Sequence, residues 1–300
     1  MRIILLIFFI VFGIHPALAG DEEIRTYKNI PYLTNTQETL LQSLDIYSPQ
    51  QKTPQQKIVV IFIHGGGWAI GDKGQKSHIA KKDFFARNNI VFVSINYRMA
   101  PRYSFPAYPQ DVAAAISYVI DNIDEYGGNP SDVFLSGHSA GGHLAALVST
   151  DARYLKAYGK KLKDIKGVIL LDGAGYNIPS RFESFGNKRE RKLVRKMYEQ
   201  AFSTNPALWK DASPINYVAA EKNIPPFLVF SVVGRKEAEM QSREFVSALK
   251  NAKVPAKLVP IENSSHRKIN VSFGAQLGIK EKEALDFIDH YVRIKSRQQH

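Results

Sequence analysis

The sequence predicts an α/β protein built on one mostly parallel central sheet flanked by helices, and three observations carry this prediction. Apolar, strand-like runs alternate along the chain with longer segments of helical periodicity. Several runs, such as KIVVIFI at 57–63, are apolar at nearly every position, as expected of strands covered on both faces. At 44% apolar and 23% charged residues, the 300-residue chain has the composition of a globular protein. Strands alternating with helices favour right-handed crossovers within a single domain.

The first twenty residues, MRIILLIFFIVFGIHPALAG, predict a secretory signal peptide at residues 1–19. Arg2 precedes an apolar run that is short for a membrane span, and residues 17–19 have the form of a cleavage site. We expect export to the periplasm or medium after cleavage near Ala19, with a retained N-terminal anchor as the alternative. The chain has no cysteine, which excludes disulfides, a lipoprotein anchor and a thiol nucleophile.

Periodicity and turn residues then place the elements of the domain, residues 20–300, in order. Strands are predicted at 42–47, 58–64, 90–96, 132–136, 167–172, 226–233 and 256–261. Helices are predicted at 76–88, 109–122, 140–150, 239–252 and 280–294.

Residues 176–217 interrupt this alternation, because the segment is too long for an ordinary connection. It contains one apolar stripe at helical spacing, formed by Leu193, Val194, Met197, Tyr198, Ala201 and Phe202. Basic residues at 188–196 lie largely on the other face of this helix. We interpret the segment as a short helical cap over the carboxyl edge of the sheet, where open α/β folds bind ligands.

The stretch LSGHSAGGHL contains a G-x-S-x-G motif, Gly137 to Gly141, between a predicted strand and a predicted helix. A sharp turn from strand to helix strains the backbone of its middle residue, and the flanking glycines remove Cβ atoms that would clash. The hydroxyl of Ser139 is then exposed above the sheet at a helix N-terminus, which favours developing negative charge. The motif therefore predicts that Ser139 is a nucleophile.

A second motif, His64-Gly65-Gly66-Gly67-Trp68, follows an apolar strand directly. Glycines let backbone N–H groups approach a substrate closely, and an oxyanion needs two or more such donors held in place. The position after a central strand favours an oxyanion-binding loop over a flexible turn.

With these motifs the chain resembles α/β-hydrolases of the hormone-sensitive-lipase-like esterase group, close to feruloyl-esterase-like and arylformamidase-like bacterial enzymes. The resemblance covers almost the whole mature chain, through HGGGWAIGDK from His64, NYRMAPRYSFPAYPQDV from Asn96, GGNPSDVFLSGHSAGGHLAAL from Gly127, LLDGAGY from Leu170 and SSHRKINVSFG from Ser264. It implies the α/β-hydrolase fold, Ser139 as the nucleophile, and oxyanion donors at Gly66, Gly67 and Ala140.

The order of residues in this fold, serine, acid, histidine, requires a base late in the chain. His266 follows the last predicted strand in the loop NSSHRKIN and is the expected base. His138 and His143 flank the nucleophile but are expected to pack or to form hydrogen bonds, and His64 to brace the glycine loop.

The acid is harder to assign, because the loop after residues 226–233 reads GRKEAE and has no aspartate where the family usually places one. Glu237 lies nearest that position and is our expected acid, since glutamate also serves in this fold. Glu239 and an acid on another strand remain alternatives, with Asp172 as the candidate of the latter kind, because geometry decides which carboxylate pairs with the histidine.

The function we predict is hydrolysis of a small carboxylic ester through an acyl-enzyme, without a metal or organic cofactor. Trp68 and Tyr176 are candidate residues of the substrate pocket, with core packing as the alternative. Hydrolysis of a formamide, amide or peptide on the same residues is the alternative reaction, and a non-catalytic binding protein the alternative class.

The formal net charge of +12 includes a concentration of basic residues at 181–196. We read this charge as a solvated cap surface first and as a contact with anionic membrane second, and not as a nucleic-acid signature.

Overall fold

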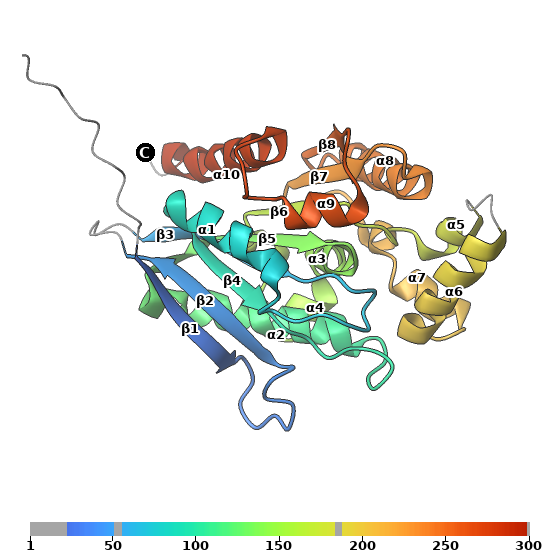
Figure 1. Cartoon of the computed structure of the whole chain (residues 1–300), viewed down its shortest axis with the longest axis horizontal. Coiled ribbons are helices and arrows are strands. Elements are labelled where there is room, and N and C mark those ends of the chain that lie inside the picture. The colour runs from blue at the N-terminus through green and yellow to red at the C-terminus, as the bar shows by residue number, and fades with distance from the viewer. Residues whose placement is uncertain (1–22, 51–55, 184–187, 299–300) are drawn as a thin grey trace, which may run out of the picture.

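The computed structural model describes residues 23–50, 56–183 and 188–298, and its centre is a twisted eight-stranded sheet (Figure 1). The strands are β1 (Ile24–Pro31), β2 (Ser43–Pro49), β3 (Lys57–Ile63), β4 (Val91–Ile95), β5 (Gly128–His138), β6 (Gly167–Leu171), β7 (Phe227–Val232) and β8 (Ala256–Ile261). Their order across the sheet is β1-β2-β4-β3-β5-β6-β7-β8. Only the pairs β1–β2 and β2–β4 are antiparallel among these strands. The predicted mostly parallel sheet is confirmed, whereas the predicted signal peptide lies outside the described residues.

Helices connect the strands and cover both faces of the sheet (Figure 1). The α-helices are α1 (Ile79–Arg87), α2 (Ala107–Asn122), α3 (Ala140–Thr150), α4 (Ala152–Lys156), α5 (Ile178–Glu183), α6 (Lys188–Phe202), α7 (Pro206–Asp211), α8 (Lys236–Asn251), α9 (His266–Val271) and α10 (Ile279–Gln298). Four 3₁₀ turns among the described residues are η1 (Lys76–His78), η2 (Ile123–Tyr126), η3 (Leu162–Asp164) and η4 (Pro214–Tyr217). In the described ranges, no helix is both long and apolar enough to cross a bilayer.

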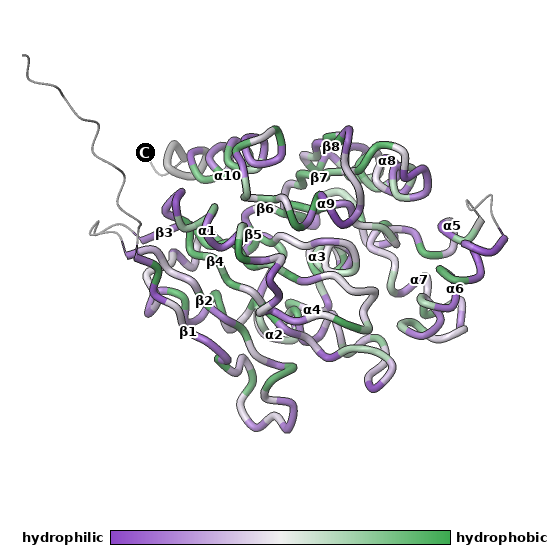
Figure 2. The backbone as a smooth tube through the Cα atoms, in the orientation of Figure 1, coloured by the Kyte–Doolittle hydropathy of each residue, from purple (hydrophilic) through white to green (hydrophobic). Residues whose placement is uncertain are grey.

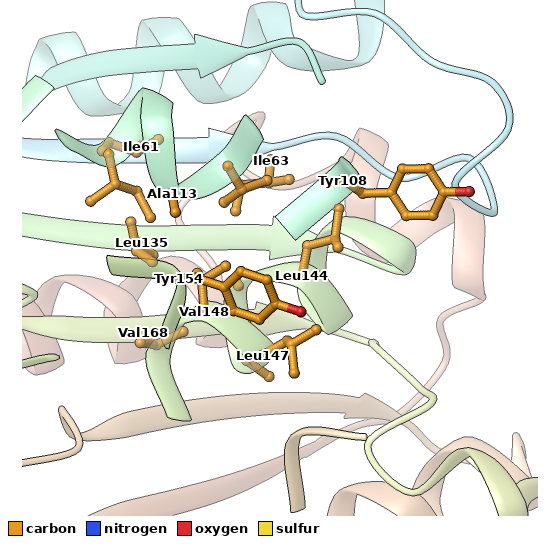
Figure 3. Close-up of a cluster of buried hydrophobic side chains, with 14 of the residues drawn as sticks. Ile61, Ile63, Tyr108, Ala113, Leu135, Leu144, Leu147, Val148, Tyr154 and Val168 are labelled. Atoms are coloured by element: carbon orange, nitrogen blue, oxygen red, sulfur yellow. The ribbon is translucent and has the colours of Figure 1, made fainter. Parts of the chain in front are cut away.

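The strands bury side chains on both faces because successive residues of a strand point to opposite sides. On β3, Ile61 and Ile63 belong to the larger core, together with side chains of α2, α3 and α8. Val60 and Phe62 alternate with them and belong to the second core, under α1, α9 and α10. Figure 3 shows part of the larger core, where side chains of β3, β5 and β6 lie together with side chains of α2, α3 and α4. This two-sided burial explains the apolar runs in the sequence.

The segment 176–217 forms helices α5, α6 and α7 at one end of the molecule, together with η4 (Figure 1). We call residues 178–217 the cap. Tyr198 and Phe202 of α6 are buried, and both rings contact Trp68, with ring centroids 4.9 and 4.8 Å from the indole. Leu193 and Met197 of the same predicted stripe are 63% and 37% exposed. The apolar stripe is thus only partly buried.

Several elements differ from the sequence-based expectation. Strand β1 was not predicted, because its sequence IRTYKNIP is largely polar and it pairs only at the edge of the sheet. Helix α9, six residues long, lies where a loop was expected. Helix α8 begins at Lys236, three residues before the predicted start, which places Glu237 in the first helical turn.

Candidate active site

The candidate site lies at the carboxyl edge of the sheet, where the predicted functional segments converge. Ser139 joins β5 to α3, Asp172 directly follows β6, and His266 is the first residue of α9, after β8. The glycine loop that starts at Gly65 follows β3. Because parallel strands end at one edge, side chains from distant parts of the chain meet there.

Ser139 occupies a strained turn between strand and helix. Its φ of 55° and ψ of −118° lie in a region that residues other than glycine seldom adopt. A Cβ on Gly137 would lie 2.4 Å from the carbonyl oxygen of Gly141, and a Cβ on Gly141 would lie 2.1 Å from that of Ile63. Both flanking positions therefore require glycine, as the motif predicts.

A chain of hydrogen bonds runs from this serine into the protein. The Ser139 Oγ lies 2.8 Å from His266 Nε2, and His266 Nδ1 lies 2.7 Å from Asp172 Oδ2. Nδ1–H donates to the carboxylate in the tautomer that leaves the Nε2 lone pair free to accept the proton of the Ser139 hydroxyl. The structure thus brings together two of the predicted residues, Ser139 and His266, with the alternative acid Asp172.

The Asp172 carboxylate is fully buried and is held by three partners. Its Oδ1 accepts the Val232 backbone N–H at 3.0 Å, and its Oδ2 accepts from His266 and from the Arg235 guanidinium. Burial alone would raise the pKa of Asp172, but the hydrogen bond to His266, the Arg235 charge and the Val232 N–H together hold this pKa below its usual value. Asp172 is therefore an ionised acceptor at neutral pH.

The expectation that Glu237 meets the histidine is wrong. Helix α8 starts early enough that Glu237 is fixed in its first turn, and Asp172 occupies the position beside His266 Nδ1. Glu239, the other alternative on this segment, accepts the backbone N–H of Gly234 and so caps its own loop. Asp172, directly after β6, forms the hydrogen bond with the histidine that these two residues of α8 do not form.

Arg235 is a residue of the site that the sequence analysis missed. Its Nη1 forms an ion pair with Asp172 Oδ2 and lies 2.9 Å from His266 Nδ1. The signal was present in the sequence, since Arg235 lies in the loop that follows a buried strand, at the edge where ligand-binding side chains gather.

The glycine loop passes close to the serine. A Cβ on Gly65 would lie 3.1 Å from the Ser139 Cβ, and Gly66 and Gly67 adopt φ values of 122° and 60°. Within the described residues, no hydrogen bond to another protein group is donated by the backbone N–H of Gly66, Gly67 or Ala140. These N–H groups stand on the two segments that meet at Ser139, so the loop can present donors beside the serine.

Three buried histidines support the site, as expected from the sequence. The His138 Nε2 lies 2.8 Å from the His266 carbonyl oxygen, the His143 Nε2 lies 2.7 Å from that of Ala212, and the His64 Nδ1 lies 2.8 Å from that of Gly65. Burial lowers the pKa of His138 to about 3 and those of His64 and His143 to about 4. All three imidazoles are neutral at physiological pH and act as hydrogen-bonding groups.

Trp68 and Tyr176, the candidate pocket residues, are buried in the larger core. Trp68 is 2% exposed and packs against the cap, and the Tyr176 ring stacks on Phe245 at 4.7 Å. The structure gives both side chains a packing role, and contact with a substrate stays a prediction. In the described ranges, no group of three or more His, Asp or Glu residues is arranged to hold a metal ion.

Comparisons with known proteins show the family and the fold of the chain. The BD-FAE family model matches residues 44–249. Esterase LipQ of Mycobacterium tuberculosis (strain ATCC 25618 / H37Rv) is 33% identical over 230 residues, which are 75% of this chain and 52% of that protein. A truncated carbohydrate esterase from gut microbiota has a similar structure, with a TM-score of 0.73, 22% identity, and coverage of 91% of this chain and 98% of that one. Esterase B from Lactobacillus rhamnosis has a TM-score of 0.75 at 19% identity, with coverage of 93% and 90%.

The chain spans about half the length of the curated relatives it matches. Similarity to the solved structures shows the α/β-hydrolase fold. Because the family model covers most of the described strands and helices, from β2 to α8, this chain belongs to the BD-FAE family.

Proposed function

We propose that the protein is a serine hydrolase that cleaves small carboxylic esters through an acyl-enzyme. The observation that carries the proposal is the chain of hydrogen bonds from Ser139 through His266 to Asp172. The backbone of Ser139 adopts a strained, positive φ of 55°. The esterases among the family relatives support the same reaction class.

The proposed reaction has two halves. His266 Nε2 takes the Ser139 proton while Oγ forms a bond to the ester carbonyl carbon, and the oxygen that becomes negative accepts hydrogen bonds from the oxyanion donors. The imidazolium then gives this proton to the leaving alkoxide oxygen as the carbon–oxygen bond breaks. In the second half a water gives its proton to Nε2, attacks the acyl carbon, and Ser139 leaves with the proton restored.

The proposed oxyanion donors are the N–H groups of Gly66, Gly67 and Ala140. Loss of one such donor typically costs about 2.7–4 kcal/mol of barrier. Asp172 holds the imidazole in the productive tautomer and stabilises the imidazolium.

Turnover of p-nitrophenyl butyrate by the purified protein tests the proposal against Ser139→Ala, with circular dichroism to check that both fold. We expect the variant to lose at least about 10³-fold in kcat, and to lose labelling by a fluorophosphonate probe. Equal turnover by the two proteins would refute the proposed nucleophile.

We also propose that the protein is exported after cleavage near Ala19.

We further propose that the cap contacts anionic lipid. Helix α6 exposes the basic side chains of Lys188, Arg191, Lys192 and Lys196, and the exposed apolar Leu193 lies among them (Figure 2 shows the start of α6 in purple). We expect binding to phosphatidylserine vesicles that weakens between low and high salt. Absence of binding at low salt would leave α6 as an ordinary solvated surface.

A further inference from the structure

Arg235 places a positive charge beside the hydrogen-bonded pair of Asp172 and His266. The guanidinium of Arg235 touches both partners of the pair, on the Nδ1 side of the imidazole, away from Ser139. Its side chain is 30% exposed, while the Asp172 carboxylate is fully buried. The cation therefore lies on the solvent side of the buried acid.

The contacts of Nδ1 exclude one another. In one tautomer Nδ1–H donates to Asp172, and Nε2 is free to accept the Ser139 proton. In the other, Arg235 donates to an unprotonated Nδ1, and Nε2 carries the hydrogen and cannot act as a base. A doubly protonated imidazolium would place two like charges about one hydrogen-bond length apart, at Nδ1 and the guanidinium.

The other charged and titratable groups around His266 do not replace this effect. His138 on β5 faces the imidazole at 4.6 Å between ring centroids but is neutral. Lys81 of α1 bonds the Asn270 carbonyl on α9, and Glu239 of α8 bonds the Gly234 N–H; neither forms a hydrogen bond with the imidazole. Arg235 is the cation in contact with the ring among the described residues.

We propose that Arg235 is a positioning residue that fixes the Asp172 carboxylate and, by its contact with Nδ1, opposes the addition of a second proton to the His266 imidazole. The inference rests on the proposed function for its kinetic consequence. Removing the cation leaves Asp172 to stabilise the imidazolium without competition, and the acid limb of activity moves to higher pH.

The test compares Arg235→Gln with Lys236→Gln, which removes one positive charge from the neighbouring, exposed residue. We expect the acid limb of the kcat/KM pH profile to rise by about 1 pH unit in Arg235→Gln, and to stay unchanged in Lys236→Gln. Arg235→Lys, which keeps the charge, should restore most of the original limb. Arg235→Met repeats the measurement should the glutamine variant fold poorly.

Titration of the His266 imidazole by NMR, assigned with His266→Gln, gives a readout that needs no turnover. A higher titration midpoint in Arg235→Gln would support the role of Arg235 whether or not the protein hydrolyses an ester. Absence of ester hydrolysis would refute the proposed function and would leave the inference about Arg235 standing. The same midpoint and the same acid limb in wild type, Arg235→Gln and Lys236→Gln would overturn the inference about Arg235.

Discussion

Asp172 and His266 are 94 residues apart in the sequence, and their side chains meet at 2.7 Å between Oδ2 and Nδ1. The acid comes from the end of β6 and the histidine from the start of α9, after β8. The strand order places β7 between them, and the loop after β7 contributes a cation, Arg235, instead of an acid. At this site the loop therefore contributes a positive charge, where the resemblance led us to expect an acidic residue.

The turn at Ser139 predicts unequal costs for two glycine substitutions. In Gly141→Ala the new Cβ would lie 2.1 Å from a backbone carbonyl oxygen, so the strand or the helix must move. We expect a loss of about 3 kcal/mol or more in the free energy of unfolding. Gly159→Ala has no atom within 4 Å of the added Cβ and is strained only by its φ of 70°, so it should cost only about 1 kcal/mol. Urea denaturation of both variants measures the difference, and equal losses would contradict the steric account.

Two histidines near the serine should act on different properties. His138→Gln weakens the hold on the His266 carbonyl, so we expect kcat to fall about tenfold with little change in KM. His143→Gln weakens the contact with the Ala212 carbonyl and should mainly lower stability, by about 1–3 kcal/mol. Steady-state kinetics and urea denaturation on both variants check this division. An unchanged kcat in His138→Gln would show that the contact with His266 does not position the base.

Stability should fall on acidification, because buried histidines stay neutral in the folded state. Burial lowers the pKa values of His64, His78 and His143 to about 4, from 6.5 in the unfolded chain. Between these values the unfolded state binds more protons, so the free energy of unfolding decreases as pH drops from about 6.5 to 4. Each residue contributes on the order of 1 kcal/mol by pH 5. Urea midpoints at pH 7 and pH 5 measure the trend, and a constant midpoint would contradict it.

The fold and the nucleophile could be predicted from local sequence. Buried parallel strands such as β3 are apolar runs, and the backbone strain at Ser139 requires glycines at fixed spacing. His266 followed from the order of residues in the fold. Strand β1 escaped prediction because a solvated edge strand lacks an apolar period.

The acid could not be predicted in the same way, because it depends on where a helix begins. The first turn of α8 holds Glu237, and nothing in GRKEAE marks whether the chain turns helical at Lys236 or three residues later. His266 forms its hydrogen bond with Asp172 because the end of β6 lies close to the start of α9 in the fold. The spacing of residues in the sequence does not encode this proximity.

The most direct test of the relay from Asp172 through His266 to Ser139 is kcat/KM for p-nitrophenyl butyrate in Asp172→Asn and Glu237→Gln. The asparagine cannot stabilise the imidazolium and favours the wrong tautomer, so we expect a loss of about 10³-fold or more. Glu237→Gln should stay within about twofold of wild type, because the His266 ring has Ser139, Asp172 and Arg235, and not Glu237, as its hydrogen-bond partners among the described residues. A severe loss in Glu237→Gln beside a nearly active Asp172→Asn would contradict the proposed relay.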